Sequence, residues 1–288
     1  MDAAEAKKQA VLCWTVAPCG PSVPDLPPGS KPYFDELVAG RRDYAPWISE
    51  ALHYSASRDL DVLDVGSGQG IDAYEYASRG ARVVGIDLTP RHVELAALHL
   101  AATGLSAWFV QGDAESMPFP DDSFDVVSSN GVLHHTPDID AALAECLRVL
   151  RPGGTFTVLL YNRRSFYYWI TQALMNGILG GVLLRGGSMS GVLSASVEAG
   201  SALGARPLVR AYSPGEVRRL LESAGFESAE VFTRHFRVGD VPVIHRLHVP
   251  TRVLEVLGRI GGWYVIGTCR KPTARALDPS KTMVSQGG

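Results

Sequence analysis

The sequence has few cysteines and no excess of positive charge. Its 288 residues carry a formal net charge of −3, and the 4 cysteines are Cys13, Cys19, Cys146 and Cys269. None of their spacings is that of a zinc site or a disulfide framework, so we expect no metal. The charge balance lacks the basic footprint of a nucleic-acid-binding protein, so we expect no nucleic-acid partner. The cysteine usage is typical of a reducing compartment, which favours a cytoplasmic location.

A secretory leader and a convincing membrane span are also missing. The first nine residues carry both signs of charge, unlike a signal peptide. Residues 166–184 contain no charged residue, which is the formal signature of a span. However, Gln172, Asn176 and three glycines dilute that stretch, and residues after 226 must return to complete the fold. We therefore expect an apolar lid over a substrate site, with peripheral membrane contact as the remaining alternative.

The most informative segment is residues 62–70, which read Val-Leu-Asp-Val-Gly-Ser-Gly-Gln-Gly. The apolar start predicts a buried strand, and a helix beginning at Ile71 follows the glycines. A dinucleotide fingerprint would space its glycines G-x-G-x-x-G, whereas this loop is one residue shorter. Asp64 at the strand end would repel a pyrophosphate but suits a cationic ligand. The segment therefore predicts a ligand-binding strand–loop–helix unit that differs from a nicotinamide site.

Four further apolar runs predict strands that each end at a polar group. The second run ends at Asp87, roughly 20 residues past the first glycine, where an acid can accept the hydroxyls of a ribose. The third, fourth and fifth are expected at 108–110, 124–128 and 155–160, with helical patterns between them. Alternating strands and helices predict a parallel sheet, and open sheets of this kind bind ligands at the carboxyl ends of their strands.

With these pieces in order, the chain resembles the class I S-adenosylmethionine (SAM)-dependent methyltransferases, in particular the ubiquinone-biosynthesis-like type 11 group. The matching pieces are VLDVGSGQG, GID, GDAESMPF, FDVVSSNGVLHH and LRPGG, within residues 60–160. The resemblance implies an α/β fold with a Rossmann-like, doubly wound, seven-stranded sheet. That sheet is mostly parallel with one antiparallel strand, the last one, beside the fifth.

The resemblance also sets the expected organisation of the chain. Residues 1–58 form an N-terminal cap, with a helix from Tyr33 that breaks near Pro46, and residues 59–270 form the methyltransferase domain. A helical insertion or lid occupies residues 163–210, and residues 271–288 are expected to be a disordered tail.

The resemblance further implies which residues bind SAM and its product S-adenosylhomocysteine. Asp64 and the loop of Gly66, Ser67, Gly68 and Gly70 face the methionine portion. Asp87 takes the ribose, Leu88 packs on the adenine, and Asp113 accepts from the adenine amino group with Ala114 and Glu115 beside it. Asn130, Gly131 and His134 line the floor near the sulfonium.

Three residues are candidates for acid–base chemistry, should the methyl acceptor need to lose a proton. His134 and His135 titrate near neutral pH, and Tyr161 ends the fifth strand. The paired histidines could equally shape the cofactor floor. We expect His92 and His99, on a predicted helix, to lie at the surface.

The function implied is methyl transfer from SAM to a small, hydrophobic or aromatic metabolite, with O- or C-methylation favoured. The position after the fourth strand reads Ser129-Asn130-Gly131-Val132, without the prolines of amino-methyltransferases that act on nucleic-acid bases. Two alternatives remain. One is a SAM-binding protein without methyl transfer, and the other is an NAD(P)-binding oxidoreductase, which the glycine spacing disfavours.

Overall fold

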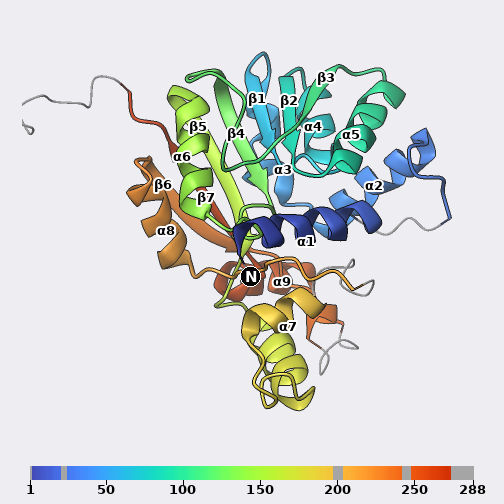
Figure 1. Cartoon of the computed structure of the whole chain (residues 1–288), viewed down its shortest axis with the longest axis vertical. Coiled ribbons are helices and arrows are strands. Elements are labelled where there is room, and N and C mark those ends of the chain that lie inside the picture. The colour runs from blue at the N-terminus through green and yellow to red at the C-terminus, as the bar shows by residue number, and fades with distance from the viewer. Residues whose placement is uncertain (1, 21–24, 197–203, 242–247, 274–288) are drawn as a thin grey trace, which may run out of the picture.

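A computed structural model describes residues 2–20, 25–196, 204–241 and 248–273 of the chain. Its centre is a seven-stranded sheet with the strand order β3-β2-β1-β4-β5-β7-β6 (Figure 1). The strands are β1 (Asp61–Val65), β2 (Arg82–Asp87), β3 (Ala107–Gln111), β4 (Phe124–Asn130), β5 (Leu150–Tyr161), β6 (Glu227–Arg234) and β7 (Tyr264–Arg270). Only β7 runs against its neighbours β5 and β6, so the predicted mostly parallel sheet with one antiparallel strand is confirmed.

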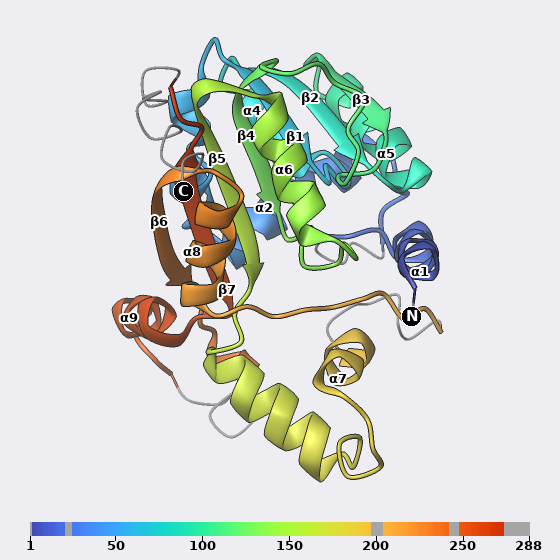
Figure 2. The same cartoon turned by 60° about the vertical axis from the view of Figure 1, so that its left-hand side comes forward.

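Helices cover both faces of this sheet, as the alternating pattern predicted. They are α1 (Ala3–Val16), α2 (Lys31–Tyr44), α3 (Ile48–Ala51), α4 (Ile71–Ala77), α5 (Pro90–Ala102), α6 (Ile139–Val149), α7 (Met189–Ser196), α8 (Pro214–Ser223) and α9 (Thr251–Gly261). Short 3-10 turns lie at Tyr54–Ser57 and Val238–Asp240. Figure 2 shows α6 and α8 on one face, with α2 and α4 behind the sheet.

The core is divided between these two faces. On the face of α6 and α8, Leu143, Cys146 and Leu221 pack with Val127 and Phe156 of the strands. Burial of Cys146 agrees with its position on an apolar helix face. On the opposite face, α3 and α4 bury a second cluster against β1 and β2. Burying apolar surface on both sides, at about 25 cal/mol per Å², holds the parallel strands in register.

Local signals in the sequence explain several helix ends. The Ser213 and Glu216 side chains form the predicted capping box at the start of α8. Asp138 caps α6 by accepting from the Ala141 backbone N–H at 3.0 Å. In the N-terminal region, Ser30 caps α2, and the chain breaks before α3 at Pro46 as expected.

Two parts of the chain differ from the sequence-based expectations. Helix α1 was not predicted, although Asp2 caps it and Glu5 lies in its first turn. Strand β5 begins at Leu150, five residues before the expected start, because Leu150 pairs with Phe124 across an irregularity in β4. Residues 274–288 of the proposed tail lie outside the described residues.

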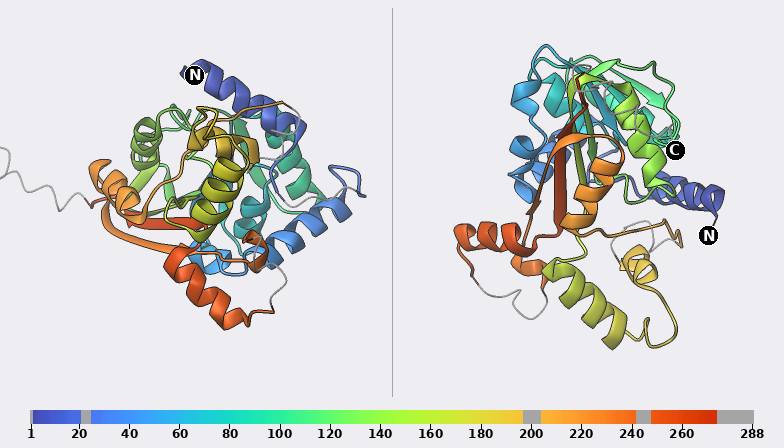
Figure 3. Two further views of the ribbon diagram at one scale, coloured as in Figure 1. Left: turned by 90° about the horizontal axis from the view of Figure 1, so that it is seen from below. Right: turned by 90° about the vertical axis from the view of Figure 1, so that its left-hand side faces the viewer.

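The insertion after β5 is a helical hairpin beyond the carboxyl edge of the sheet. A π-helix, η2 (Tyr167–Leu179), leads into a turn and then α7 (Figure 3). Within the described residues, no helix combines the length and apolarity that crossing a membrane requires.

Candidate cofactor and active site

A cavity of about 520 Å³ opens at the carboxyl ends of β1, β2, β4 and β5. Its size falls within the range of ~300–1,000 Å³ typical of small-molecule sites. The strand ends supply its floor, and α1, the loop after α1, and α2 supply its opposite wall. The cavity therefore lies at the edge where the sequence predicted a ligand, under a cover made by the start of the chain.

The glycine loop after β1 turns through backbone angles that favour glycine. Gly66, Gly68 and Gly70 have φ of +76°, +52° and +76°. A Cβ on Gly66 would lie 2.2 Å from the Val132 side chain. The loop is thus shaped by close contact with the loop after β4 as well as by its own turn.

Two polar atoms beneath this loop are buried and have no hydrogen-bond partner in the described structure. They are Oδ2 of Asp64 and Oγ of Ser67. Burial, together with the nearby carboxylates of Asp72 and Asp87, raises the pKa of Asp64 well above its ordinary value. Buried polar atoms are normally paired, so these two atoms make the underside of the loop polar where a core would be apolar.

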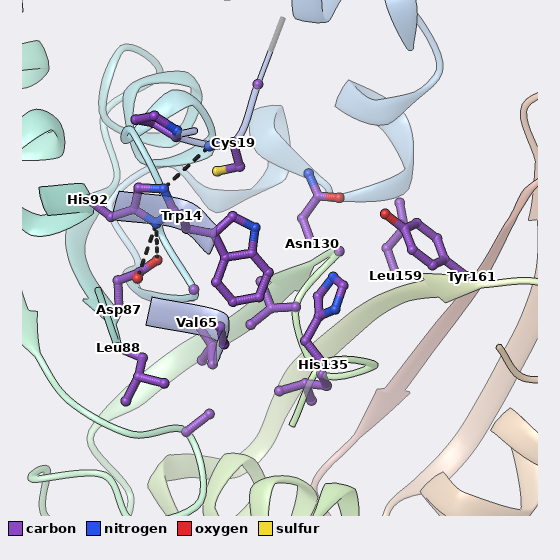
Figure 4. Close-up of a pocket in the computed structure, with 18 of the residues that line it drawn as sticks. Trp14, Cys19, Val65, Asp87, Leu88, His92, Asn130, His135, Leu159 and Tyr161 are labelled. Carbon is purple, nitrogen blue, oxygen red and sulfur yellow. Dashed lines mark hydrogen bonds and ion pairs between the residues drawn. The ribbon is translucent and has the colours of Figure 1, made fainter. Parts of the chain in front are cut away.

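Asp87 lies at the end of β2 and is held by the protein on three sides (Figure 4). Its Oδ2 accepts from the Gly68 N–H at 2.9 Å, and its Oδ1 accepts from the Thr89 N–H at 2.8 Å. Nδ1 of His92 is 3.2 Å from both oxygens. A carboxylate has about four lone-pair positions, so the protein leaves room for a limited further contact.

His92 is not a surface residue, contrary to the sequence-based expectation. It is 2% exposed, because the loop around Cys19 covers it. Burial alone would lower the pKa of His92, but Cys19 and Asp87 outweigh it and raise the pKa to about 10. Nε2 of His92 accepts from the Cys19 backbone N–H at 3.4 Å while Nδ1 faces Asp87, so His92 joins Asp87 to the loop after α1.

His99 was also expected at the surface and is 1% exposed. Its Nδ1 donates to the Gln69 carbonyl at 2.9 Å, and its ring stacks on Phe34, with centroids 4.4 Å apart. The expectation was wrong because α2 packs over this face of α5. His99 therefore supports the glycine loop from behind.

Helix α1 closes the cavity above Asp113. The Lys7 ammonium is 2.6 Å from Asp113 Oδ2 and also pairs with Glu115. Glu115 accepts from the Thr136 hydroxyl and from the Asp138 N–H, so it joins α1 to two loops. Of the three predicted residues in this loop, Asp113 and Ala114 line the cavity, whereas Glu115 holds the cover in place.

A buried charge cluster lies at the end of the cavity near α2. The Arg41 guanidinium is 3.7 Å from Asp72, and Asp72 also accepts from Tyr54 and from Asn130 Nδ2, at 2.6 and 2.7 Å. Burial disfavours the charge of Arg41, but Asp72 more than compensates and raises its pKa. Arg41 lines the cavity beside Asn130, and sequence analysis did not identify it.

The predicted acid–base residues lie together, but not equally near the cavity. His135 and Tyr161 line it. Nδ1 of His135 is 2.7 Å from the Leu208 carbonyl, so this nitrogen must carry the proton and the lone pair of the neutral ring lies on Nε2. Figure 4 shows the His135 ring between Trp14 and Tyr161, and the Trp14 and His135 centroids are 4.9 Å apart.

His134 lies behind this pair and is fully buried. Its ring centroid is 3.8 Å from that of Tyr161, and it is not among the cavity-lining residues. Burial and the neighbouring His135 lower the pKa of His134 well below its ordinary value. His134 therefore packs as a neutral ring under Tyr161.

The remaining predicted residues also fall into two groups, those that line the cavity and those behind its wall. Gly66, Leu88, Asn130 and Gly131 line the cavity, whereas Asp64, Ser67, Gly68 and Gly70 lie beneath its wall. Sequence analysis missed most of the aromatic lining, which comprises Trp14, Tyr44, Trp47 and Tyr264. The residues come from α1, the α2–α3 region and β7, whose proximity to the site depends on tertiary structure.

Comparisons with known proteins agree with this fold. Residues 63–158 match the family described as "Methyltransferase domain". A ubiquinone biosynthesis O-methyltransferase of Pseudomonas fluorescens is 34% identical over 44% of this chain and 55% of its own length. A sterol 24-C-methyltransferase of Gibberella zeae is 38% identical over 46% of this chain and 35% of its own length. The matched region thus spans about half or less of these relatives.

Among solved structures, a putative methyltransferase of Bacillus halodurans superimposes with a TM-score of 0.52. It is 23% identical and covers 78% of this chain and 99% of its own, which supports the shared fold. The family match, the sheet order and the glycine loop agree with one another. Residues 63–158 therefore carry a methyltransferase domain, within the fold of the class I S-adenosylmethionine-dependent methyltransferases.

Proposed function

We propose that this protein transfers a methyl group from SAM to a small, hydrophobic or aromatic metabolite. The observation that carries the proposal is one continuous cavity with Asp87 at one end and His135 and Tyr161 at the other. Such a cavity can hold the cofactor and an acceptor in contact, and in-line transfer depends mainly on that positioning. O- or C-methylation is favoured.

The residues present fit the cofactor. SAM supplies a methyl group activated by a sulfonium cation. Asp87 is available to a ribose hydroxyl, and Leu88 offers an apolar surface to the adenine. The unpaired oxygens of Asp64 and Ser67 lie beneath the cavity wall, so the support of the glycine loop is polar and suits a polar ligand above it. Arg41 provides the positive charge that a carboxylate of the methionine portion requires.

The aromatic walls define what the acceptor end can bind. Trp14, Tyr44, Trp47, Tyr161 and Tyr264 all contribute to the cavity lining. Rings of this kind bind flat apolar molecules and exclude water from the reaction. Where the acceptor is a hydroxyl group, Nε2 of His135 can remove its proton, because Nδ1 is committed to the Leu208 carbonyl.

The decisive experiment incubates the protein and isotopically labelled SAM with a small-metabolite extract and follows label by mass spectrometry. A labelled metabolite that forms with the wild type but not with a Gly66→Ala variant supports the proposal. Titration calorimetry with SAM runs in parallel. Binding without any labelled product would indicate a SAM-binding protein that does not transfer methyl groups, and NADH binding in place of SAM would contradict the assignment.

A further inference from the structure

The large apolar side chains at the surface are concentrated in two segments. Thirteen such residues are exposed in the described structure, and nine of them lie in residues 169–184 or in α9. The nine are Trp169, Leu174, Ile178, Leu179, Val182, Leu184, Val253, Val256 and Ile260. Singly scattered apolar residues are normal at a protein surface, whereas a concentration of this kind marks an interaction site.

Helix η2 separates its buried and exposed faces clearly. Tyr168 and Ala173 are buried on the side that meets α7, and Gln172 accepts there from the Ser196 hydroxyl. Trp169 and Leu174 are 60 and 45% exposed on the other side. The hairpin projects past the carboxyl edge of the sheet, and α9 lies at the same end of the molecule (Figure 2). The outer side of η2 is therefore apolar and uncovered in this chain.

This apolar face does not serve the cavity. Among the described residues of this insertion, 163–196 and 204–210, none lines the cavity, because α1 and α2 supply the cover instead. The expectation that residues 166–184 face the substrate as a lid is therefore not supported by the geometry. The exposed apolar stretch needs a different explanation.

The charges around the face are positive. No charged residue occurs in residues 166–184, and the stretch is bounded by Arg163 and Arg164 before it and by Arg185 after it. Among the described residues, no carboxylate forms an ion pair with Arg164 or Arg185, whereas Arg163 pairs with Glu216. An uncharged helix with unpaired arginines at both ends complements a surface that is apolar inside and anionic at its edge.

We propose that the outer face of η2, together with residues 180–185, docks on an anionic lipid membrane without spanning it. The exposed indole of Trp169 suits the boundary between headgroups and acyl chains, and Arg164 and Arg185 meet the phosphates. The 13 residues of η2 are too short for the ~20-residue span that a bilayer requires. A second copy of this chain is a poorer occupant, because twofold pairing would bring the arginines of both copies together.

The proposal is independent of methyl transfer and is tested by sedimentation with vesicles. The probes are phosphatidylcholine vesicles alone and with about 30% phosphatidylglycerol. We expect the wild-type protein to sediment with the anionic vesicles and at least about tenfold less with the neutral ones. A Leu179→Asp/Leu184→Asp variant should lose about tenfold or more of this binding. Arg164→Gln and Arg185→Gln should each lose about fivefold.

Matched controls separate docking from general effects. Trp108 is 77% exposed and lies on β3, the edge strand farthest from the β6 edge and away from β5, after which the hairpin begins. Trp108→Asp should therefore sediment like the wild type. Circular dichroism and SAM titration establish that the variants are folded. Absence of vesicle binding by the wild type, or unchanged binding by the double variant, would overturn the proposal. So would a wild-type dimer in light scattering that becomes a monomer in the double variant without any vesicle binding.

Discussion

Nδ1 of His92 lies 3.2 Å from both carboxylate oxygens of Asp87. This contact packs the acid that faces the cavity against the His92 imidazole, which in turn contacts the segment around Cys19. The residue expected to bind the ribose is therefore also a structural residue. Its orientation depends on the start of the chain as well as on β2.

Asp87→Ala should weaken SAM binding by about 1.5–3 kcal/mol, the typical cost of losing hydrogen bonds to a charged acceptor. The sequence alone suggested little effect on folding, but Asp87 also accepts two backbone N–H groups and faces His92. We therefore expect a loss of stability too. Titration calorimetry and urea unfolding measure the two effects. Asp35→Ala, at an exposed carboxylate paired with Lys31, should change neither.

Arg41→Gln should weaken SAM binding about tenfold or more, because it removes the partly buried positive charge that lines the cavity. The neighbouring Arg42 provides a matched control, since it is more than half exposed and pairs with Glu75. Arg42→Gln should bind SAM normally. Equal affinities of the two variants would show that Arg41 does not contact the cofactor.

His135→Gln should lower kcat by about 10²–10⁴ for a hydroxyl acceptor, because Nε2 of His135 is the proposed base. KM for SAM should stay nearly constant, since His135 is assigned to the acceptor end. Tyr161→Phe, which keeps the ring packed against Trp263, should have a smaller effect. Steady-state kinetics with the acceptor identified by labelling compares the kcat of the two variants. An unchanged kcat in His135→Gln would show that His135 is not the general base.

His235 should make the protein less stable in mild acid. It is buried, and burial together with Arg237 lowers its pKa to about 4. In the unfolded chain the His235 imidazole binds a proton near pH 6.5, whereas in the folded chain it binds one only near pH 4. Stability is therefore expected to fall as the pH drops from about 6.5 to 4, by up to about 1.4 kcal/mol per pH unit from this group.

Urea unfolding between pH 7 and 4 checks this slope. His235→Asn should flatten it, and asparagine tolerates the φ of +73° at this position. His248→Asn, at an exposed residue, should leave the slope unchanged. A slope that is equal in the wild type and His235→Asn would show that His235 titrates normally.

Gly66→Ala should destabilise the fold more than Gly131→Ala. Both glycines have φ near +75°, so a side chain in this backbone region costs about the same strain, about 1–2 kcal/mol, at either position. A Cβ added at position 66 would clash with the Val132 side chain, whereas a Cβ added at position 131 would have no atom within 4 Å. Thermal unfolding compares the two, and equal losses would mean that Val132 moves aside without cost.

The sequence predicted the sheet and the edge that bears the cavity well, because β1, β2 and β4 each carry an apolar run and end at or next to a glycine, an acid or an asparagine. Gly66, Asp87 and Asn130 could be placed for that reason. The cover of the cavity could not be predicted. Lys7 pairs with Asp113, which is more than a hundred residues away in the sequence, and no local pattern in α1 indicates that contact. Likewise, His92 and His99 have ordinary helical positions, and only packing of the N-terminal segments buries them.

The position of α1 has a consequence for how the protein forms during synthesis. Lys7 leaves the ribosome long before Asp113 and Glu115, so α1 has no binding site until β3 and the loop after it exist. Helix α1 can therefore dock through these pairs only after the loop after β3 has been made, and in that position it covers the cavity. A cofactor that binds before α1 docks would be enclosed by that docking.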